Sequence, residues 1–212
     1  MIVSLFPDFQ LNNKEIISLL GRRKKKVKTI DTSYLNLIEE LKETSKNFIQ
    51  PKAIYKIFDQ NHLPIRASFE EAEKIVLAIC TIGENLPNQV NSFIEKNELV
   101  KAVILDAIGS VIVEKVADYI NHQINLEAQK LKLEFGSRYS PGYCSWETKD
   151  QKLIFDNLSG NEIGVCLTDS LMMKPIKSIS FAVNLGHDIA KTRWENRCRL
   201  CEQKMQCSYK LS

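Results

Sequence analysis

The chain has 212 residues, of which 44% are hydrophobic and 26% are charged, and its formal net charge is +3 at pH 7. So small a charge argues against a nucleic-acid-binding protein and against attraction to anionic membranes. No apolar run reaches the length of a membrane span, and the first residues lack the basic start and cleavage site of a signal peptide. We therefore expect a cytoplasmic protein whose six cysteines are reduced thiols or metal ligands rather than disulfides.

The first hundred residues predict three helices and two strands. Asn12 and Asp31 are candidate N-caps, because each precedes a stretch with helical spacing of apolar residues. Two strands and a helix are predicted next, at 53–58, 75–82 and 84–95.

A dense basic run at residues 22–28 separates the first two predicted helices. It contains no aromatic residue, which argues against single-stranded nucleic acid as its ligand. A solvated connection is the simplest interpretation. A docking patch for an acidic partner is the alternative, because long-range attraction speeds encounter without specific contacts.

The longest predicted element is a helix over 99–131. The residues expected to face the core are Val100, Val103, Ile104, Ala107, Ile108, Val111 and Ile112. At about 100° per residue, Glu114 projects within this apolar face, and Asp118 follows one turn later on the same side. A carboxylate at that position must lie at a cleft, form an ion pair or serve a ligand, unless the helix simply emerges into water there.

Residues 138–146, RYSPGYCSW, combine a turn with a cation and aromatic rings. A turn is expected at 140–142, because successive proline and glycine stop both helix and strand. Arg138 carries a planar fork of donors suited to a carboxylate, and Tyr143 and Trp146 can stack on a base or face a cation. A small molecule with a carboxylate, an aromatic ring and a positive charge, such as S-adenosylmethionine, would fit this loop. The alternative is a structural turn whose aromatic rings pack in the core.

The last third of the chain predicts a helix over 148–158 and two strands, at 163–168 and 178–183. The bend between these strands suggests that they form an antiparallel pair. Together with the earlier strands, they predict an α+β fold in which helices wrap an antiparallel sheet.

Three blocks of sequence lie in register across roughly residues 100–183. One is Arg138, three residues before Pro-Gly-Tyr at 141–143, and another is Glu114 in the long helix. The third begins with Leu-Thr-Asp-Ser at 167–170 and continues with Met173, Pro175, Ser178 and Ser180. In order and spacing, these blocks resemble the activation domain of cobalamin-dependent methionine synthase.

The resemblance implies a curved α+β fold with an antiparallel sheet and a shallow groove that binds S-adenosylmethionine. Arg138 would hold the ligand carboxylate, and Glu114 would face the polar or cationic part of the ligand. Phe181 stands where a glycine often follows the family's Ser-x-Ser. The residues that the resemblance assigns to the ligand are Glu114, Arg138, Tyr139, Pro141, Gly142 and Tyr143.

The chain lacks the Asp-x-His-x-x-Gly signature that grips a corrinoid, so the resemblance implies a free-standing module that serves a corrinoid-binding partner. The implied function is reductive methylation, or reactivation, of a corrinoid protein such as methionine synthase. By this resemblance, an electron donor would reduce inert Co(II), and methyl transfer from S-adenosylmethionine would pull this uphill reduction forward. The protein would contribute proximity and orientation without a general base, so catalysis would be shared with the partner.

No internal repeat or flexible linker divides the chain, so only a loose division is made. We expect an N-terminal lobe at 1–97, an S-adenosylmethionine-binding lobe at 98–190 and a tail at 191–212. The tail holds three closely spaced cysteines, Cys198, Cys201 and Cys207. Their spacing predicts zinc or an iron–sulfur cluster, although a fourth ligand must come from elsewhere. Three reduced surface thiols are the alternative.

Two other functions are compatible with the sequence. The first is a stand-alone S-adenosylmethionine-dependent methyltransferase, although no glycine-rich nucleotide loop follows an early strand, as the common doubly wound methyltransferase fold requires. The second is a metal-tailed interaction protein that docks through its basic run. Methylation of a small molecule or peptide without a corrinoid would favour the first of these.

Overall fold

The computed structural model describes residues 1–22, 31–63, 72–143, 146–187 and 189. Its helices and strands are, in chain order, β1 (Ile2–Val3), α1 (Asn13–Ile17), α2 (Thr32–Ser45), β2 (Lys52–Asp59), β3 (Lys74–Thr81), α3 (Asn85–Glu95), α4 (Leu99–Lys130), β4 (Glu134–Tyr139), α5 (Gln151–Asn157), β5 (Cys166–Leu167), β6 (Met173–Lys174) and β7 (Ser178–Gly186). Short 3₁₀ or π turns lie at Ser18–Arg22, Gln60–His62, Thr148–Asp150 and Gly160–Ile163.

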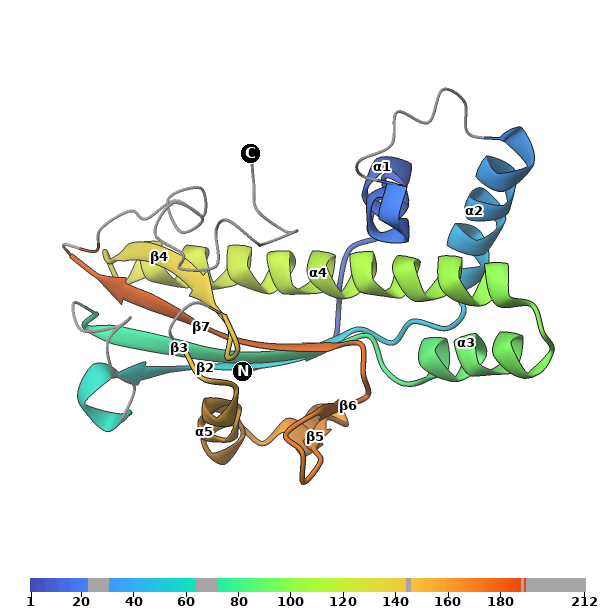
Figure 1. The fold of residues 1–212 in the computed structure, drawn as a ribbon. Helices are drawn as coiled ribbons and strands as arrows, with labels where there is room; N and C mark the ends of the chain where they lie inside the picture. The colour runs from blue at the N-terminus through green and yellow to red at the C-terminus, as the bar shows by residue number, and fades with distance from the viewer. Residues whose placement is uncertain (23–30, 64–71, 144–145, 188, 190–212) are drawn as a thin grey trace.

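The centre of the fold is a five-stranded sheet with the order β1-β2-β3-β7-β4. All four neighbouring pairs are antiparallel. In Figure 1, α4 runs along one face of this sheet, while α5 and the small β5–β6 sheet lie on the other face. The predicted class, an α+β fold with helices around an antiparallel sheet, is therefore confirmed.

Each face of the sheet carries its own hydrophobic core. Val76 and Ala78 of β3 belong to the core around α4, which we call the α4-side core. The intervening Ile75 and Leu77 belong to the core around α5, the α5-side core. All four side chains are completely buried, because β3 lies in the middle of a sheet that is covered on both faces. This explains why β3 is almost continuously hydrophobic in sequence.

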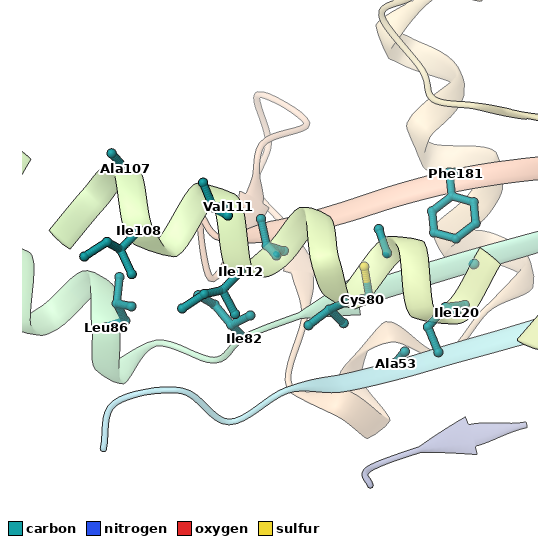
Figure 2. Close-up of a cluster of buried hydrophobic side chains, with 14 of the residues drawn as sticks. Ala53, Cys80, Ile82, Leu86, Ala107, Ile108, Val111, Ile112, Ile120 and Phe181 are labelled. Carbon is teal, nitrogen blue, oxygen red and sulfur yellow. The ribbon is translucent and has the colours of Figure 1, made fainter. Parts of the chain in front are cut away.

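The α4 helix organises the larger core. It has 32 residues, and is therefore about 48 Å long. Figure 2 shows its side chains meeting those of α3 and of three strands, among them Ile108, Ile112, Ile120, Leu86, Ala53, Cys80 and Phe181. The lobe boundary predicted near residue 97 falls between α3 and α4, and both helices contribute to this same core.

The first turn of α4 differs from the prediction. Val100 and Val103, which we expected inside, are 57% and 58% exposed. Ala102 and Leu105, on the other side of the helix, are buried instead. The buried side at this end is set by the neighbours α2 and α3, and the periodicity of α4 alone does not reveal it.

The two predicted N-caps are confirmed. The side-chain oxygen of Asn12 accepts a hydrogen bond from the backbone N–H of Lys14 at 2.9 Å. Asp31 accepts one from the backbone N–H of Ser33 at 3.1 Å. Of the basic run between these helices, residues 23–28 lie outside the described part of the chain.

The late strands pair differently from the prediction. Of the strand expected at 163–168, Ile163 is the last residue of the 3₁₀ turn Gly160–Ile163, and only the two residues of β5 belong to a strand. Gly164 follows this turn with φ of 77°, which redirects the chain. As a result β5 pairs with β6, whereas β7 lies between β3 and β4. Because β7 is buried on both faces, it suits the middle of the sheet.

None of the described helices has both the length and the apolar composition needed to span a lipid bilayer.

Two cysteines provide a chemical test of the core. Cys80 is completely buried, and this burial raises the pKa of its thiol to about 12, whereas Cys166 is exposed. Because the thiolate is the reactive form, iodoacetamide at pH 8 should modify Cys166 in the native protein and Cys80 only after unfolding. Peptide mapping by mass spectrometry measures both sites in one sample. Equal labelling of both cysteines in the native protein would contradict the burial of Cys80.

Candidate functional site

A groove of about 690 Å³ opens beside β7, at the point where β4 ends. Its volume falls within the range of about 300–1,000 Å³ that is typical of small-molecule sites. Its lining comes from α4, β4 with the loop after it, α5, β6 and the start of β7, namely Glu114, Asp118, Asn121, Ser137, Arg138, Ser140, Pro141, Tyr143, Gln151, Met173, Ser178, Ile179 and Ser180.

The groove exists because β4 is shorter than β7. The pairing between these strands ends where Tyr139 lies opposite Ala182. The chain then makes the predicted turn at 140–142, and Gly142 takes φ of 90°, which a residue without a side chain adopts at little cost. The backbone N–H of Tyr143 closes the turn by donating to the carbonyl of Ser140 at 3.2 Å. The residues of β7 that precede Ala182, Ser180 among them, are not paired with β4 and therefore border the groove.

Arg138 is held by two carboxylates of α4. Its Nη2 atom lies 2.7 Å from Glu114 Oε2, and its Nη1 atom lies 3.3 Å from Asp118 Oδ1. The two acidic residues are one helical turn apart, so they face the guanidinium together. Beneath it lies the ring of Phe181, whose centroid is 5.5 Å from the guanidinium carbon. Only 17% of the Arg138 side chain is exposed.

A β-bulge in β4 precedes Arg138. Phe135 pairs with Leu185 and Arg138 pairs with Val183, so two residues of β4 lie opposite one residue of β7. A bulge of this kind adds one residue to a strand and re-aims the side chains that follow it.

The bulge determines which face of the sheet Arg138 occupies. Residues three apart in a regular strand point to opposite faces. Phe135 and Arg138 nevertheless lie on the same face, because their partners Leu185 and Val183 both belong to the α4-side core. Without the extra residue, Arg138 would face α5 and could not reach the carboxylates of α4.

The charges in the groove are unequal. Arg138 supplies one positive charge, and Glu114 and Asp118 supply two negative charges. Desolvation in the groove raises the pKa of Asp118; the Arg138 cation opposes this rise, and the Glu114 carboxylate adds to it. Both carboxylates are more exposed than the guanidinium, so a ligand can approach them from solvent.

The model of one protein family, described as vitamin B12 dependent methionine synthase, activation domain, matches residues 64–192. This range is more than half of the chain and contains every residue that lines the groove. The chain belongs to this family.

One similar solved structure is the MetH reactivation domain bound to AdoHcy, with a TM-score of 0.61. The alignment covers 90% of this chain and 78% of that chain, at 13% sequence identity. At this identity the likeness concerns the fold. No curated protein matches the chain in sequence.

The family's motif residues take different places around the groove. Glu114, Arg138, Pro141 and Tyr143 line it, and Tyr143 is 66% exposed. Two other predicted residues contribute less directly: Gly142 forms the turn, and Tyr139 packs against the α5-side core. The alternative of a structural turn placed both aromatic rings of the loop in the core; it holds for Trp146, which is buried in the α5-side core, and not for the exposed Tyr143.

Sequence reasoning missed part of the lining. Asn121 lies three residues beyond Asp118 on the same side of α4, and helical spacing could have identified it. Gln151 and Ser137 had no such signal, because the first comes from another helix and the second from the bulge.

The metal site predicted in the tail, with Cys198, Cys201 and Cys207, lies outside the described residues and stays a prediction. Elsewhere, within the described part of the chain, no group of three or more His, Cys, Asp or Glu side chains is arranged to hold a metal ion.

Proposed function

We propose that this protein is an S-adenosylmethionine-binding activation module for the reductive methylation of a corrinoid protein such as cobalamin-dependent methionine synthase. The observation that carries the proposal is the placement of Arg138 between Glu114 and Asp118 in a groove that also holds an exposed Tyr143. S-adenosylmethionine carries a carboxylate, an ammonium, a sulfonium and a purine ring. Each of these has a complementary group in the groove.

The ion pairs of the free protein suggest how the ligand binds. Its carboxylate would take the bidentate fork of Arg138, which Glu114 and Asp118 occupy in the absence of ligand. The two displaced carboxylates would then face the ammonium and the sulfonium. Binding therefore exchanges one set of ion pairs for another, and no buried charge is left alone. Tyr143 offers a flat face on which the adenine can stack.

The groove would serve methyl transfer by holding the ligand where a second protein can reach it. The methyl carbon exchanges its bond to sulfur for a bond to the Co(I) corrinoid of the partner, and a neutral thioether leaves. An external low-potential electron donor reduces Co(II) to Co(I) beforehand. Residues of this chain orient the sulfonium, and the reaction removes no proton, so it requires no general base.

A reconstituted reaction tests the proposal. Methionine synthase that lacks its own activation domain, held in the Co(II) state, is mixed with a low-potential reductant and methyl-labelled S-adenosylmethionine. Addition of this protein should transfer label to the corrinoid, with the cobalt state followed by absorbance. Glu114→Gln should slow the transfer, whereas Glu127→Gln, on α4 but outside the groove lining, should not.

The same assay separates the proposal from its competitor. Without a corrinoid protein, no label should reach small molecules or peptides. Corrinoid-independent methylation of either would replace the proposal with the stand-alone methyltransferase.

A further inference from the structure

Three hydrogen-bond acceptors form a row along one side of α4. Glu114, Asp118 and Asn121 are spaced by four and three residues, so they lie on one face of the helix. All three line the groove. We call Glu114, Asp118 and Asn121 the acceptor row. Because α4 is packed along its length, the row is held on a rigid element.

Asn121 carries an unused acceptor. Its Oδ1 atom is shielded from solvent and has no hydrogen-bond donor within the described part of the chain. A buried acceptor without a partner is destabilising, because it has lost its hydrogen bond to water and gained none in return. An oxygen of this kind in a groove is suited to an N–H or O–H group of a ligand. A sulfonium has no such hydrogen, so the donor must come from a part of the ligand that methyl transfer leaves unchanged.

Asp118 is the freer of the two carboxylates that contact Arg138. Its distance to the guanidinium is 3.3 Å, against 2.7 Å for Glu114. Its side chain is 67% exposed, against 57% for Glu114. Asp118 is therefore the carboxylate that can most easily turn toward a second cation.

Charge balance then distinguishes the ligand before and after methyl transfer. With the ligand carboxylate on Arg138, Glu114 and Asp118 are left to face the ammonium and the sulfonium. Loss of the methyl group turns the sulfonium into an uncharged thioether. One carboxylate in the groove then has no counter-charge, and the hold on the product weakens.

We propose that the acceptor row is a cation subsite that makes the groove selective for the sulfonium over the thioether product. Asp118 pairs with the sulfonium charge, which S-adenosylmethionine carries and the thioether product does not. Asn121 Oδ1 accepts a hydrogen bond from a group that S-adenosylmethionine and the product share. This inference rests on the proposed function, because it assumes that S-adenosylmethionine is the ligand. According to this inference, the groove also releases the thioether product more readily than it releases S-adenosylmethionine.

Calorimetry with three ligands tests the assignment. S-adenosylmethionine and sinefungin both carry a positive charge at or next to the sulfur position, whereas S-adenosylhomocysteine does not. The wild-type protein should bind the two charged ligands more tightly. Asp118→Asn should weaken both of them by about tenfold and change S-adenosylhomocysteine little. Asn121→Ala should weaken all three ligands alike.

A control variant and distinct outcomes complete the design. Glu127→Gln removes a negative charge from α4 outside the groove lining, and should preserve the preference for charged ligands. If Asp118→Asn weakens all three ligands equally, the residue only positions Arg138 and the selectivity proposal is overturned. If none of the three ligands binds to the wild-type protein, the proposed function itself fails.

Discussion

Replacement of Arg138 by alanine is expected to weaken S-adenosylmethionine binding by about 2–4 kcal/mol, because a charged bidentate partner is lost from a partly desolvated site. In the free protein this guanidinium is only 17% exposed and lies between two carboxylates. The alanine variant leaves Glu114 and Asp118 one turn apart without a cation between them. The ligand carboxylate then meets two negative charges where it had met a fork of donors.

Calorimetry on two variants distinguishes the contribution of the Arg138 charge to ligand affinity from that of its planar guanidinium. Arg138→Lys keeps the positive charge but lacks the planar fork, so its affinity should lie between those of the wild type and Arg138→Ala. Lys130→Ala removes an exposed cation from the last turn of α4 and serves as the control for net charge. Wild-type affinity in Arg138→Ala would show that Arg138 is structural and that the ligand carboxylate binds elsewhere.

Substitution of Gly136 by alanine is expected to damage both stability and binding. A Cβ atom at this position would lie 1.9 Å from Asn184 Oδ1 and 2.9 Å from the backbone oxygen of Asn184. Since Gly136 lies within the bulge, the strands must separate or the bulge must move. We expect a loss of about 1–3 kcal/mol in the free energy of unfolding, as for overpacking in general. Ligand binding should fall as well, because the bulge directs Arg138 toward α4.

Chemical denaturation and calorimetry measure the two effects separately. The double variant Gly136→Ala, Asn184→Ala should recover part of the loss, because it removes the closest clash. The Asn184 Oδ1 atom is buried without a partner among the described residues, so its removal should itself cost little. Ser137→Ala, in the same bulge, should keep most of the stability. Unchanged binding in Gly136→Ala would show that the bulge does not control the position of Arg138.

Much of the fold could be predicted from local patterns. The strands β2 and β3 and the helices α3 and α4 lie where their periodicity indicated, and Asn12 and Asp31 cap the helices that follow them. These features depend on neighbours within a few residues in sequence, which is why a single sequence reveals them. The pairing of β7 with β3 and β4 depends on segments far apart in the chain, and local pattern predicted it wrongly.

The residue types of the candidate site could also be recognised from short stretches of sequence. Arg138 before a Pro-Gly turn, Tyr143 after it and Glu114 on the apolar side of a helix indicated a ligand with a carboxylate and a cation. By itself, the sequence determined these residue types, the long helix and the turn.

Only the tertiary structure decided that Arg138 meets Glu114 and Asp118. That contact requires α4 to pack against the face of the sheet at β4, and it requires one extra residue in β4. A one-residue bulge reverses the face of every side chain after it, yet it has little signature in sequence, because it arises from how two strands fit each other. The same assembly brings Asn121 to the groove with its Oδ1 atom lacking a partner among the described residues, since whether a polar atom is satisfied depends on everything packed around it.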